Sequence, residues 1–465
     1  MVKDYLINKI TNKMRKPTTN IFWFRRDLRL KDNAGLYHAL KSDFPVLPIF
    51  IFDSNILDKL EDKQDARVTF IHRTVVALQK ELGELGSSLL IKYGNPEMIW
   101  KELLETYAIN AVFTNHDYEK YALERDATVK KLVTQKGGTF HTFKDHVIFE
   151  KGEVLKKDGL PYIVFTPYSR IWKAKLLERM EVITDKNGKK LNLSYYFKPY
   201  PNEKYFANFY KTISFPCPTL REMGFEETTI DLPNPTVSRG LIRNYDKTRN
   251  FPAIAGTSKL GIHFRFGTIS IREKARNAAQ LNETFLNELI WRDFYAMILA
   301  HFPHVANGAF RKKYENIPWR NNEKEFKKWC EGKTGYPMVD AGMRELNATG
   351  FMHNRVRMVT SSFLTKHLLI DWRWGEAYFA QKLLDFDLAS NNGGWQWAAG
   401  CGTDAAPYFR IFNPTTQMQK FDKELKYIKK WIPEYETITY PSPIVDHKLA
   451  RERCLRIFKA ALNNN

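Results

Sequence analysis

Asn20-Ile-Phe-Trp-Phe24 and Val46-Leu-Pro-Ile-Phe-Ile-Phe52 are short apolar stretches of β-prone residues, and a helical pattern lies between them. The same alternation continues to about residue 150. We expect strands at 20–24, 46–52, 88–93, 111–115 and 139–148, and helices at 33–41, 65–85, 96–107 and 118–135. Asp32 or Asn33 is the expected cap of the first helix. Strand–helix alternation over this length predicts a mostly parallel, Rossmann-like sheet with helices on both faces.

The rest of the chain changes character twice. Residues 151–240 have weak periodicity and many Pro, Asn, Tyr and Lys residues, which is typical of a connector, with one helix near 167–180. From 241 to 465 strand signals nearly vanish, helical patterns dominate, and eight of the eleven tryptophans are found there. The predicted fold class is therefore an α/β N-terminal domain (20–150) and an all-α C-terminal domain (241–465). Residues 1–19 are interpreted as an N-terminal extension.

The composition narrows the class of protein. Hydrophobic residues make up 43% and charged residues 27%, as in soluble globular proteins. The formal net charge of +20 suits a polyanionic partner such as nucleic acid, although a basic surface also serves general solubility. The four cysteines form neither a C-x-x-C pair nor a Cys/His pattern. We therefore expect no disulfide, no metal site and a reducing cytoplasm.

Gly256-Thr-Ser-Lys-Leu-Gly261 is the first segment with a chemical signal. Glycines and small hydroxyl residues let backbone N–H groups approach phosphate oxygens closely. The segment is not a P-loop, because Lys-Ser/Thr does not follow the second glycine, and no G-x-G-x-x-G motif follows the first predicted strand. A phosphate-binding loop and a plain helix cap both fit this pattern.

A helical segment, 287–294, places Glu288, Trp291 and Arg292 on one face, because residues three and four apart are neighbours on a helix. An acid, a flat aromatic ring and a guanidinium suit a flipped nucleobase through a hydrogen bond, a stack and a phosphate contact. A packed tryptophan beside an ion pair fits the same pattern equally well.

Two later segments also carry polar residues at helical spacing. In 352–358, Asn354, Arg357 and Met358 share a face, whereas Arg355 points elsewhere and could meet a phosphate. His353 fits a general base, but a histidine that is simply hydrogen-bonded is the favoured interpretation. In 385–397, Gly-Gly follows Asn-Asn, which tightens or breaks the helix and permits close backbone approach to a ligand.

These segments resemble the photolyase and cryptochrome family over nearly the whole chain. Four blocks carry the resemblance: Trp23-Phe-Arg-Arg-Asp-Leu-Arg-Leu-Lys-Asp-Asn33, Glu331-Gly-Lys-Thr-Gly-Tyr-Pro-Met-Val-Asp340, Asn391-Asn-Gly-Gly-Trp-Gln-Trp397 and Gly402-Thr-Asp-Ala-Ala-Pro-Tyr-Phe-Arg-Ile-Phe-Asn-Pro-Thr415. The chain looks most like the class I photolyases that act on cyclobutane pyrimidine dimers. The resemblance implies a helical domain that holds FAD non-covalently. It also implies light-driven electron transfer from excited FADH⁻ to a flipped-out dimer in UV-damaged DNA, without net redox change.

The resemblance also implies roles for individual residues. The residues expected to hold FAD are Tyr245, Thr257, Ser258, Lys259, Leu260, Gly261, Phe285, Arg357, Asp385, Asp387 and Asn391. Arg357 would pair with Asp385, and Asn391 would face the flavin N5, where an asparagine favours repair over photoreception. The residues expected to bind and split the dimer are Glu288, Asn354, Met358, Asn391, Trp291 and Trp397. Trp395, Trp372 and Trp319 match the family's electron-transfer chain, and DNA phosphates would meet Arg249, Arg292, Arg355 and Arg410.

Some questions stay open at this point. The segment 118–126 lacks the Asn-Glu pair of folate-binding relatives, so an antenna site holding a folate, a deazaflavin, another flavin or nothing is equally compatible. The alternatives to dimer repair are a (6-4) photolyase, a signalling cryptochrome and a DASH-type relative that prefers single strands. Asn354 and Met358 argue against the first of these. We expect a cytoplasmic monomer that binds no membrane.

Overall fold

The computed structural model describes residues 17–184, 188 and 190–463. The chain forms two compact units, and neither is continuous in sequence. The first unit comprises residues up to His146 with Pro199–Thr228 and Phe266–Ser270, and the second comprises Val147–Lys198, Thr229–Arg265 and Ile271 onward. The segment interpreted as a connector, 151–240, thus contributes to both units. The predicted N-terminal extension lies outside the described residues except for its last three positions.

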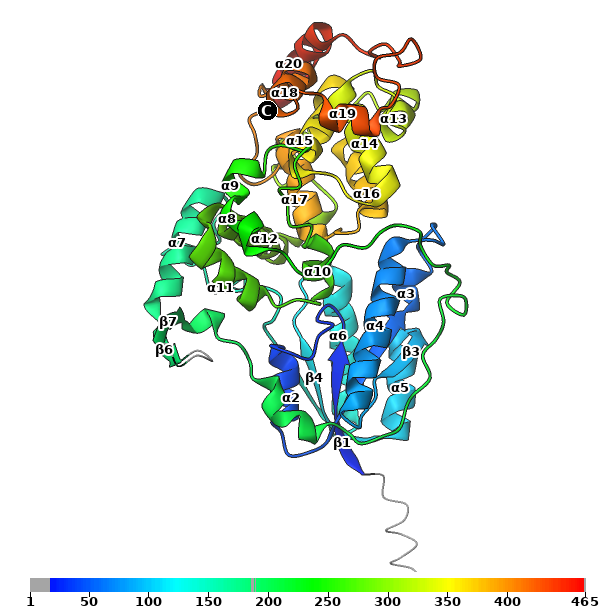
Figure 1. Ribbon diagram of the computed structural model, residues 1–465, viewed down its shortest axis with the longest axis vertical. Coiled ribbons are helices and arrows are strands. Elements are labelled where there is room, and N and C mark those ends of the chain that lie inside the picture. The colour runs from blue at the N-terminus through cyan, green and yellow to red at the C-terminus, as the bar shows by residue number, and fades with distance from the viewer. Residues whose placement is uncertain (1–16, 185–187, 189, 464–465) are drawn as a thin grey trace, which may run out of the picture. The chain divides into compact units, whose positions relative to one another are not determined.

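The first unit contains a five-stranded parallel sheet with the strand order β3-β2-β1-β4-β5 (Figure 1). The strands are β1 (Thr18–Phe24), β2 (Val46–Asp53), β3 (Leu90–Gly94), β4 (Ala108–Asn115) and β5 (Thr139–Phe143). The helices are α2 (Ala34–Leu40), α3 (Ser54–Leu57), α4 (Ala66–Glu84), α5 (Pro96–Thr106) and α6 (Lys120–Gln135), with a 3₁₀ turn η2 (Asn202–Asn208). The predicted α/β domain is confirmed. The predicted fifth strand ends earlier than expected, at Phe143.

The side chains of β1 alternate between the two faces of the sheet, as a strand requires. Phe22 and Phe24 pack into a core with residues of α2 and α4. Ile21 and Trp23 point the other way and pack with residues of α5 and α6. Helices therefore cover both faces, which explains why the strands are apolar throughout.

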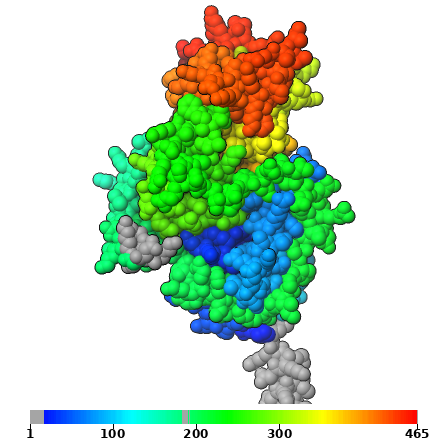
Figure 2. Space-filling view, in the orientation of Figure 1, coloured from blue at the N-terminus to red at the C-terminus, as the bar shows by residue number. Residues whose placement is uncertain are grey.

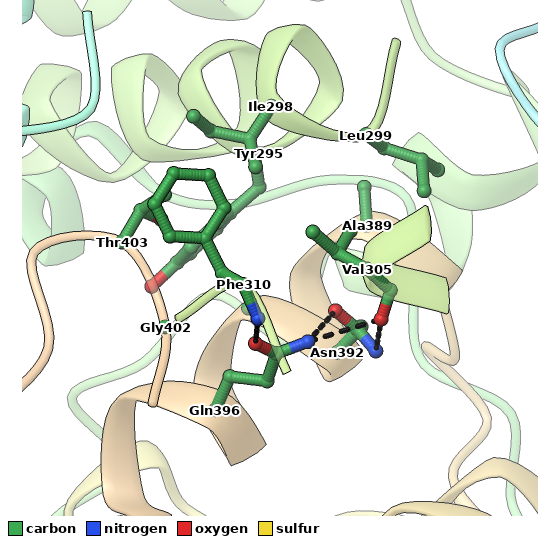
Figure 3. Close-up of a pocket in the computed structure, with 11 residues that line it drawn as sticks. Tyr295, Ile298, Leu299, Val305, Phe310, Ala389, Asn392, Gln396, Gly402 and Thr403 are labelled. Atoms are coloured by element: carbon green, nitrogen blue, oxygen red, sulfur yellow. Dashed lines mark hydrogen bonds between the residues drawn. The ribbon is translucent and has the colours of Figure 1, made fainter. Parts of the chain in front are cut away.

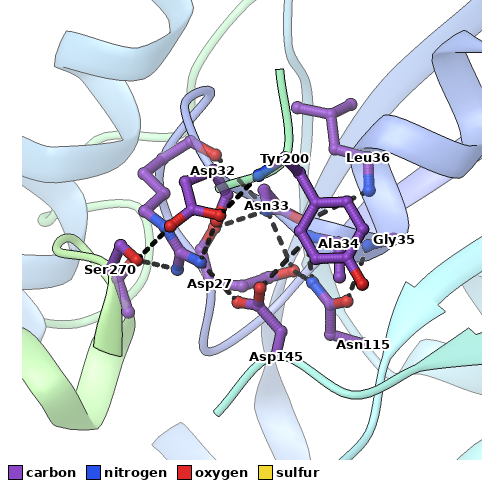
Figure 4. Close-up of polar contacts among 12 residues, drawn as sticks. Asp27, Asp32, Asn33, Ala34, Gly35, Leu36, Asn115, Asp145, Tyr200 and Ser270 are labelled. Carbon is purple, nitrogen blue, oxygen red and sulfur yellow. Dashed lines mark hydrogen bonds and ion pairs between the residues drawn. The ribbon is translucent and has the colours of Figure 1, made fainter. Parts of the chain in front are cut away.

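A buried polar network fastens the loop that follows β1, and it accounts for much of the first family block (Figure 4). The Asn115 amide donates to Asp27 at 2.6 Å and to Asn33 at 2.8 Å, and Asn33 caps α2 by accepting from Leu36 N. Burial raises the pKa of Asp27. Asp145 accepts from Ala34 N and from Arg29. These residues serve the fold, because the hydrogen bonds described here are all made within the unit.

The second unit is mainly helical, and the described residues after 241 contain no strand. Its long helices are α7 (Phe165–Glu178), α11 (Ile271–Leu281), α12 (Glu283–His301), α14 (Pro337–Thr349), α15 (Asn354–Ser362), α16 (Trp372–Lys382), α17 (Leu388–Ala399) and α20 (His447–Asn463). The shorter helices are α8 (Arg239–Arg243), α9 (Tyr245–Thr248), α10 (Gly261–Phe266), α13 (Glu323–Cys330), α18 (Pro414–Phe421) and α19 (Lys426–Trp431), with turns η1 (Tyr195–Phe197), η3 (Pro303–Ala306), η4 (Lys312–Asn316) and a π-helical turn η5 (Phe363–His367). The C-terminal helices lie at the surface, where Figure 2 shows them in orange and red.

Two features of this unit were not expected. A two-stranded antiparallel hairpin, β6 (Met180–Thr184) and β7 (Lys190–Ser194), lies in the predicted connector. Asp293 on α12 is buried and accepts hydrogen bonds from Ile148 N, Phe149 N and the Trp172 indole, which ties α7 and the preceding loop to α12. Among the described helices, none is both long and apolar enough to cross a membrane.

Candidate active site

The second unit encloses a cavity of about 440 Å³, a size that is ordinary for ligand pockets. Helices α10, α12, α15, α16 and α17 supply most of its wall. The sequence-predicted residues that line it are Arg249, Gly261, Glu288, Trp291, Arg292, Asn354, Arg357, Met358, Asp385, Asp387, Asn391, Trp395 and Trp397. Residues separated by more than a hundred positions thus meet at one cavity.

The α12 wall contains the acid–aromatic–guanidinium face that helical spacing predicts. Asn282 caps this helix by accepting from Phe285 N, and Glu288, Trp291 and Arg292 all reach the cavity. Phe165 stacks on Trp291 with ring centroids 3.7 Å apart and planes 4° apart, so the indole orientation is fixed. Burial raises the pKa of Glu288, and Arg249, which forms an ion pair with its carboxylate, lowers it.

The α15 wall begins at a histidine cap. The Nδ1 of His353 accepts from Arg355 N, and burial lowers the pKa of His353 to about 4, with Arg357 adding to the effect. A neutral histidine that caps the helix agrees with the interpretation of His353 as a hydrogen-bonded residue and not with that of a general base. Asn354 and Met358 line the cavity as the spacing predicts.

Arg355 points away from this wall. Its Nη2 donates to Asn250 Oδ1 at 2.7 Å, its Nη1 lies 3.6 Å from Met358 Sδ, and its guanidinium lies 4.6 Å from the centre of the Phe421 ring. These contacts hold Met358 and the segment after α9 in place. They engage both Nη atoms of the guanidinium within the protein.

Two acid–arginine pairs also line the cavity. Arg357 pairs with Asp385 at 2.9 Å, as the resemblance implies. A Cβ on Gly261 would lie 2.5 Å from the Cβ of Asp385, so only glycine permits this approach. Asp387 caps α17 by accepting from Ser390 N at 3.1 Å, and its carboxylate lies 3.5 Å from Arg265. Arg265 was not predicted from the sequence, because a single arginine in a short helix carries no signal.

Asn391 and Glu376 meet at the junction of α16 and α17. The Asn391 amide nitrogen donates to the Glu376 carbonyl at 3.2 Å, which leaves the amide oxygen for the cavity. Burial raises the pKa of the Glu376 carboxyl to about 7, and its Oε1 accepts from Asn392 at 3.3 Å. Sequence reasoning missed Glu376, since no pattern marks an acid in a helix as buried.

Several predicted residues do not line the cavity. Tyr245 packs edge-on against buried Phe285, at 5.1 Å. Of the segment 256–261, Gly261 reaches the wall, as the first residue of α10. Lys259 has a left-handed φ of 52° and lies over the Phe351 ring. The predicted residues found outside the wall are Tyr245, Thr257, Ser258, Lys259, Leu260, Phe285, Trp319, Trp372, Arg355 and Arg410.

The three tryptophans of the predicted chain share one hydrophobic core. Trp395 lines the cavity, Trp372 is fully buried, and Trp319 is partly buried with its ring edge on Phe458 at 5.9 Å. The sequence could not predict that the three tryptophans share a core, because spacing along the chain does not show which residues meet in space. Trp329 lies in the same core, 6.0 Å from Trp395, and was not singled out.

A second, much smaller cavity lies behind α17 (Figure 3). It measures about 10 Å³, so it holds no more than a water molecule. Asn392 and Gln396 direct their amides to the Val305 carbonyl, and Gln396 also accepts from Phe310 N. These bonds fix α17 against the turn η3 and the loop that follows it, and the site has no room for a substrate.

The larger cavity fits a flavin nucleotide. Gly261 brings its backbone close to Asp385, and the Arg357–Asp385 pair supplies fixed charge. The Asn391 amide oxygen is available to accept a hydrogen bond from a ring N–H. An α/β unit together with a helical unit that holds such a cavity defines a two-unit protein that binds a nucleotide cofactor.

Comparison with known proteins identifies the family. Residues 285–439 match the family described as the FAD binding domain of DNA photolyase, and residues 20–185 match the family described as DNA photolyase. A deoxyribodipyrimidine photo-lyase of Synechococcus sp. is 36% identical over 95% of this chain and 96% of its own length. The chain therefore belongs to the photolyase and cryptochrome family, and its helical unit is an FAD-binding domain.

Two solved structures agree with this assignment. A class III photolyase of Agrobacterium tumefaciens superposes with a TM-score of 0.81 at 31% identity, covering 96% of this chain and 98% of that one. An archaeal photolyase of Sulfolobus tokodaii, solved with two FAD molecules, gives a TM-score of 0.75 at 32% identity, covering 95% of this chain and all of that one. The second FAD of that protein is consistent with an additional chromophore in this family.

Proposed function

We propose that this protein is a carbon–carbon lyase that uses light to repair cyclobutane pyrimidine dimers in DNA. One observation carries the proposal: the residues suited to a flipped dimer and the residues suited to a flavin line the same cavity. Glu288, Trp291 and Asn354 belong to the first set, and Arg357 and Asn391 belong to the second. Contact between a lesion and a cofactor is the geometry that direct electron transfer requires.

Each residue of the lesion set has a definite task. Trp291 and Trp397 offer flat faces on which the dimer stacks, and Met358 supplies a further apolar contact. Asn354 hydrogen-bonds a pyrimidine edge, because an amide both donates and accepts. Glu288 hydrogen-bonds the other pyrimidine at the carbonyl where negative charge develops. Extrusion of the dimer costs a few kcal/mol, and least for a base that already stacks poorly.

The cofactor set orients the flavin and tunes its environment. Reduced FAD, when bound and excited by blue or near-UV light, supplies one electron that splits the dimer and then returns. Asn391 presents its amide oxygen where a ring N–H can donate to it. The Arg357–Asp385 pair places a fixed dipole at the cavity wall. Trp395, Trp372 and Trp319 conduct electrons between the surface and the cavity.

DNA binding rests on the positive charge of the helical unit. Arg249 and Arg292 lie at the cavity, and Arg410 is exposed. These three contact phosphates in the proposed complex, whereas the contacts of Arg355 favour a positioning role. We propose further that the protein acts in the cytoplasm, and that it acts as a monomer, since Glu288, Asn354 and Asn391 of one chain line a single cavity.

The deciding experiment uses purified protein loaded with FAD and reduced in the dark. A duplex oligonucleotide with a single thymine dimer is then illuminated with blue light, and intact thymines are counted against a dark control. We expect reversal in the light only. Dimers left intact by fully reduced, illuminated enzyme would exclude the proposal.

The same assay separates the alternatives. A duplex with a (6-4) lesion tests the first, and a single-stranded dimer substrate tests a DASH-type preference. A signalling cryptochrome would show light-dependent flavin reduction but no reversal of any lesion. We expect the duplex dimer to be the preferred substrate.

A further inference from the structure

Arg249 and Glu288 form an ion pair that occupies the lesion side of the cavity. Both side chains line the cavity, and the Arg249 Nη1 contacts the Glu288 Oε1. Glu288 is about one-third exposed, and this exposure is to the cavity itself. An ionised carboxylate accepts hydrogen bonds but donates none. In this state Glu288 cannot donate to a pyrimidine carbonyl, and its charge would repel an electron arriving on the dimer.

Arg249 has the longer side chain of this pair and lies on the less regular element. It lies at the C-cap of the single-turn helix α9, and its long side chain is 27% exposed. Glu288, by contrast, lies in the middle of α12, whose neighbouring residues Leu289 and Ile290 are buried. A change at this pair therefore moves Arg249 and leaves the carboxyl of Glu288 in place.

Arg249 also belongs to a cluster with excess positive charge. Arg249 and Arg410 both act on Arg355 and lower its pKa, after burial, so the three guanidinium groups are close together. Arg355 is bonded to an amide, a sulfur atom and an aromatic ring, and Arg410 lies over the Phe412 ring. Within this cluster, Glu288 is the carboxylate that pairs with Arg249. A phosphate diester is attracted to all three groups and competes with Glu288 for Arg249.

We propose that Arg249 exchanges Glu288 for a DNA phosphate when a damaged duplex binds, and that the released Glu288 takes up a proton and donates a hydrogen bond to the lesion. The inference rests on the proposed function. Without Arg249 the carboxylate would face Trp291, Met358 and Trp397, and an unpaired charge among apolar walls is costly. Proton uptake removes this cost. The neutral acid then stabilises negative charge on the carbonyl, which the carboxylate cannot do.

Burial already raises the pKa of Glu288, and Arg249 is the named influence that lowers it, so removal of Arg249 raises that pKa further. Other titratable or charged groups also face this part of the cavity. They are Tyr245 beside α9, Arg265 on α10, Arg292 and Tyr295 on α12, Arg357 on α15, and Asp385 and Asp387 before α17. Asp385 and Asp387 each have a nearby arginine. Glu288 differs from these two acids because its partner, Arg249, belongs to the arginine cluster that attracts a phosphate, so in the proposal Glu288 is the acid whose partner the DNA removes.

The test measures protons taken up on binding, in the dark, by the FAD-loaded protein. A duplex with one thymine dimer and the same undamaged duplex are titrated calorimetrically near pH 7 in two buffers of different ionisation enthalpy. We expect uptake of about one proton per complex with the damaged duplex. Glu288→Gln should abolish this uptake. Arg249→Met should reduce it, because Glu288 is already unpaired and protonated in the free variant.

Arg410→Gln is the matched control, since it removes a cationic group from the same cluster without breaking the ion pair. Its affinity should fall while proton uptake persists. Infrared difference spectra provide a second readout: the complex should gain a protonated-carboxyl band that is absent in Glu288→Gln. Repair without proton uptake, or equal uptake in Glu288→Gln, would overturn the exchange and leave the proposed function intact. Failure of the wild-type protein to bind the dimer or to repair it would overturn both.

Discussion

Asn391 is held by a single hydrogen bond that decides which of its amide atoms faces the cavity. Its nitrogen donates to the Glu376 carbonyl, so its oxygen is the amide atom left to accept a hydrogen bond from the flavin N5 in the proposed complex. An acceptor at that position favours a protonated N5, and a negative charge there changes the balance between flavin oxidation states.

Asn391→Asp tests this placement. The new carboxylate cannot donate to Glu376, and it brings a charge to the flavin. We expect the flavin potential to shift by about 60 mV or more, the equivalent of a tenfold change for one electron. The measurement is a spectroscopic redox titration. Affinity for dimer-containing DNA should persist, and unchanged flavin spectra would contradict the placement.

Glu376 supplies a pH-dependent contribution to stability. Burial raises the pKa of its carboxyl to about 7 from an ordinary value of 4.5. The folded state therefore favours the protonated form. The contribution is complete below about pH 4.5 and is lost as the pH rises toward 7.

Glu376→Gln should remove this dependence, because glutamine resembles the protonated acid and cannot ionise. Between pH 5 and pH 8 the free energy of unfolding of the wild type should fall relative to the variant by about 2–3 kcal/mol. Chemical denaturation of both proteins at several pH values measures the difference. If the free energies of unfolding of the two proteins changed equally with pH, Glu376 would have an ordinary pKa.

At the scale of elements, the contact between α12 and α17 defines the cavity. A Cβ on Gly393 would lie 2.2 Å from the Tyr295 ring, so the two helices approach closely only because this residue is glycine. The bonds of Asn392 and Gln396 to Val305 hold α17 against the turn η3, which follows α12. Trp291 and Asn391 depend on this spacing, since one lies on each helix.

Gly393→Ala should therefore separate the helices. We expect a loss of about 1–3 kcal/mol of stability from overpacking, and reduced FAD content of the purified protein. Gly83→Ala on α4 is the control, because a Cβ there meets no neighbour within 4 Å. That change should be neutral or stabilise by up to about 1 kcal/mol, through helix propensity. Equal behaviour of the two variants would show that crowding at Tyr295 is unimportant.

Elements were predicted better than the contacts between them. Apolar runs and helical spacing indicated the sheet, the Asn33 cap and the shared face of Glu288, Trp291 and Arg292. The hairpin β6–β7 was missed because strands of five residues between charged segments give little periodicity. The ion pair of Arg249 and Glu288 was also missed, since its partners are 39 positions apart and no spacing rule joins them.

At the scale of the whole molecule, electron transfer and charge both act over long distances. The helical unit carries tryptophans from the cavity wall, at Trp395, to a partly buried position, at Trp319. Trp319→Phe should slow photoreduction of oxidised flavin by tenfold or more, on the order of what one missing hop costs, while repair by pre-reduced enzyme continues.

The control for this change is Trp431→Phe, because Trp431 packs against the same core without belonging to the proposed chain. It should leave photoreduction unaffected. Flash photolysis measures flavin reduction, and the dimer assay measures repair. Equal loss of both activities in Trp319→Phe would contradict a role in electron transfer.

The net charge of +20 predicts that DNA binding depends steeply on salt. Three phosphate contacts, from Arg249, Arg292 and Arg410, correspond to a slope of roughly −3 in log affinity against log salt concentration. Arg410→Gln should reduce the slope by about 0.9. The slope is obtained by measuring the affinity for a dimer-containing duplex at several potassium chloride concentrations, from low to moderate. A flat response would remove the phosphate contacts from the proposal.

The α/β unit is completed by residues far downstream. Leu28 N donates to the Phe266 carbonyl, Arg29 donates to Gly267, and Ser270 bonds to Asp32. During synthesis, the loop after β1 therefore waits for more than two hundred further residues before its last partners leave the ribosome. All five strands are complete at Phe143, so a nascent chain stopped near residue 150 would have its strands but would expose the loop after β1 to chaperones and proteases.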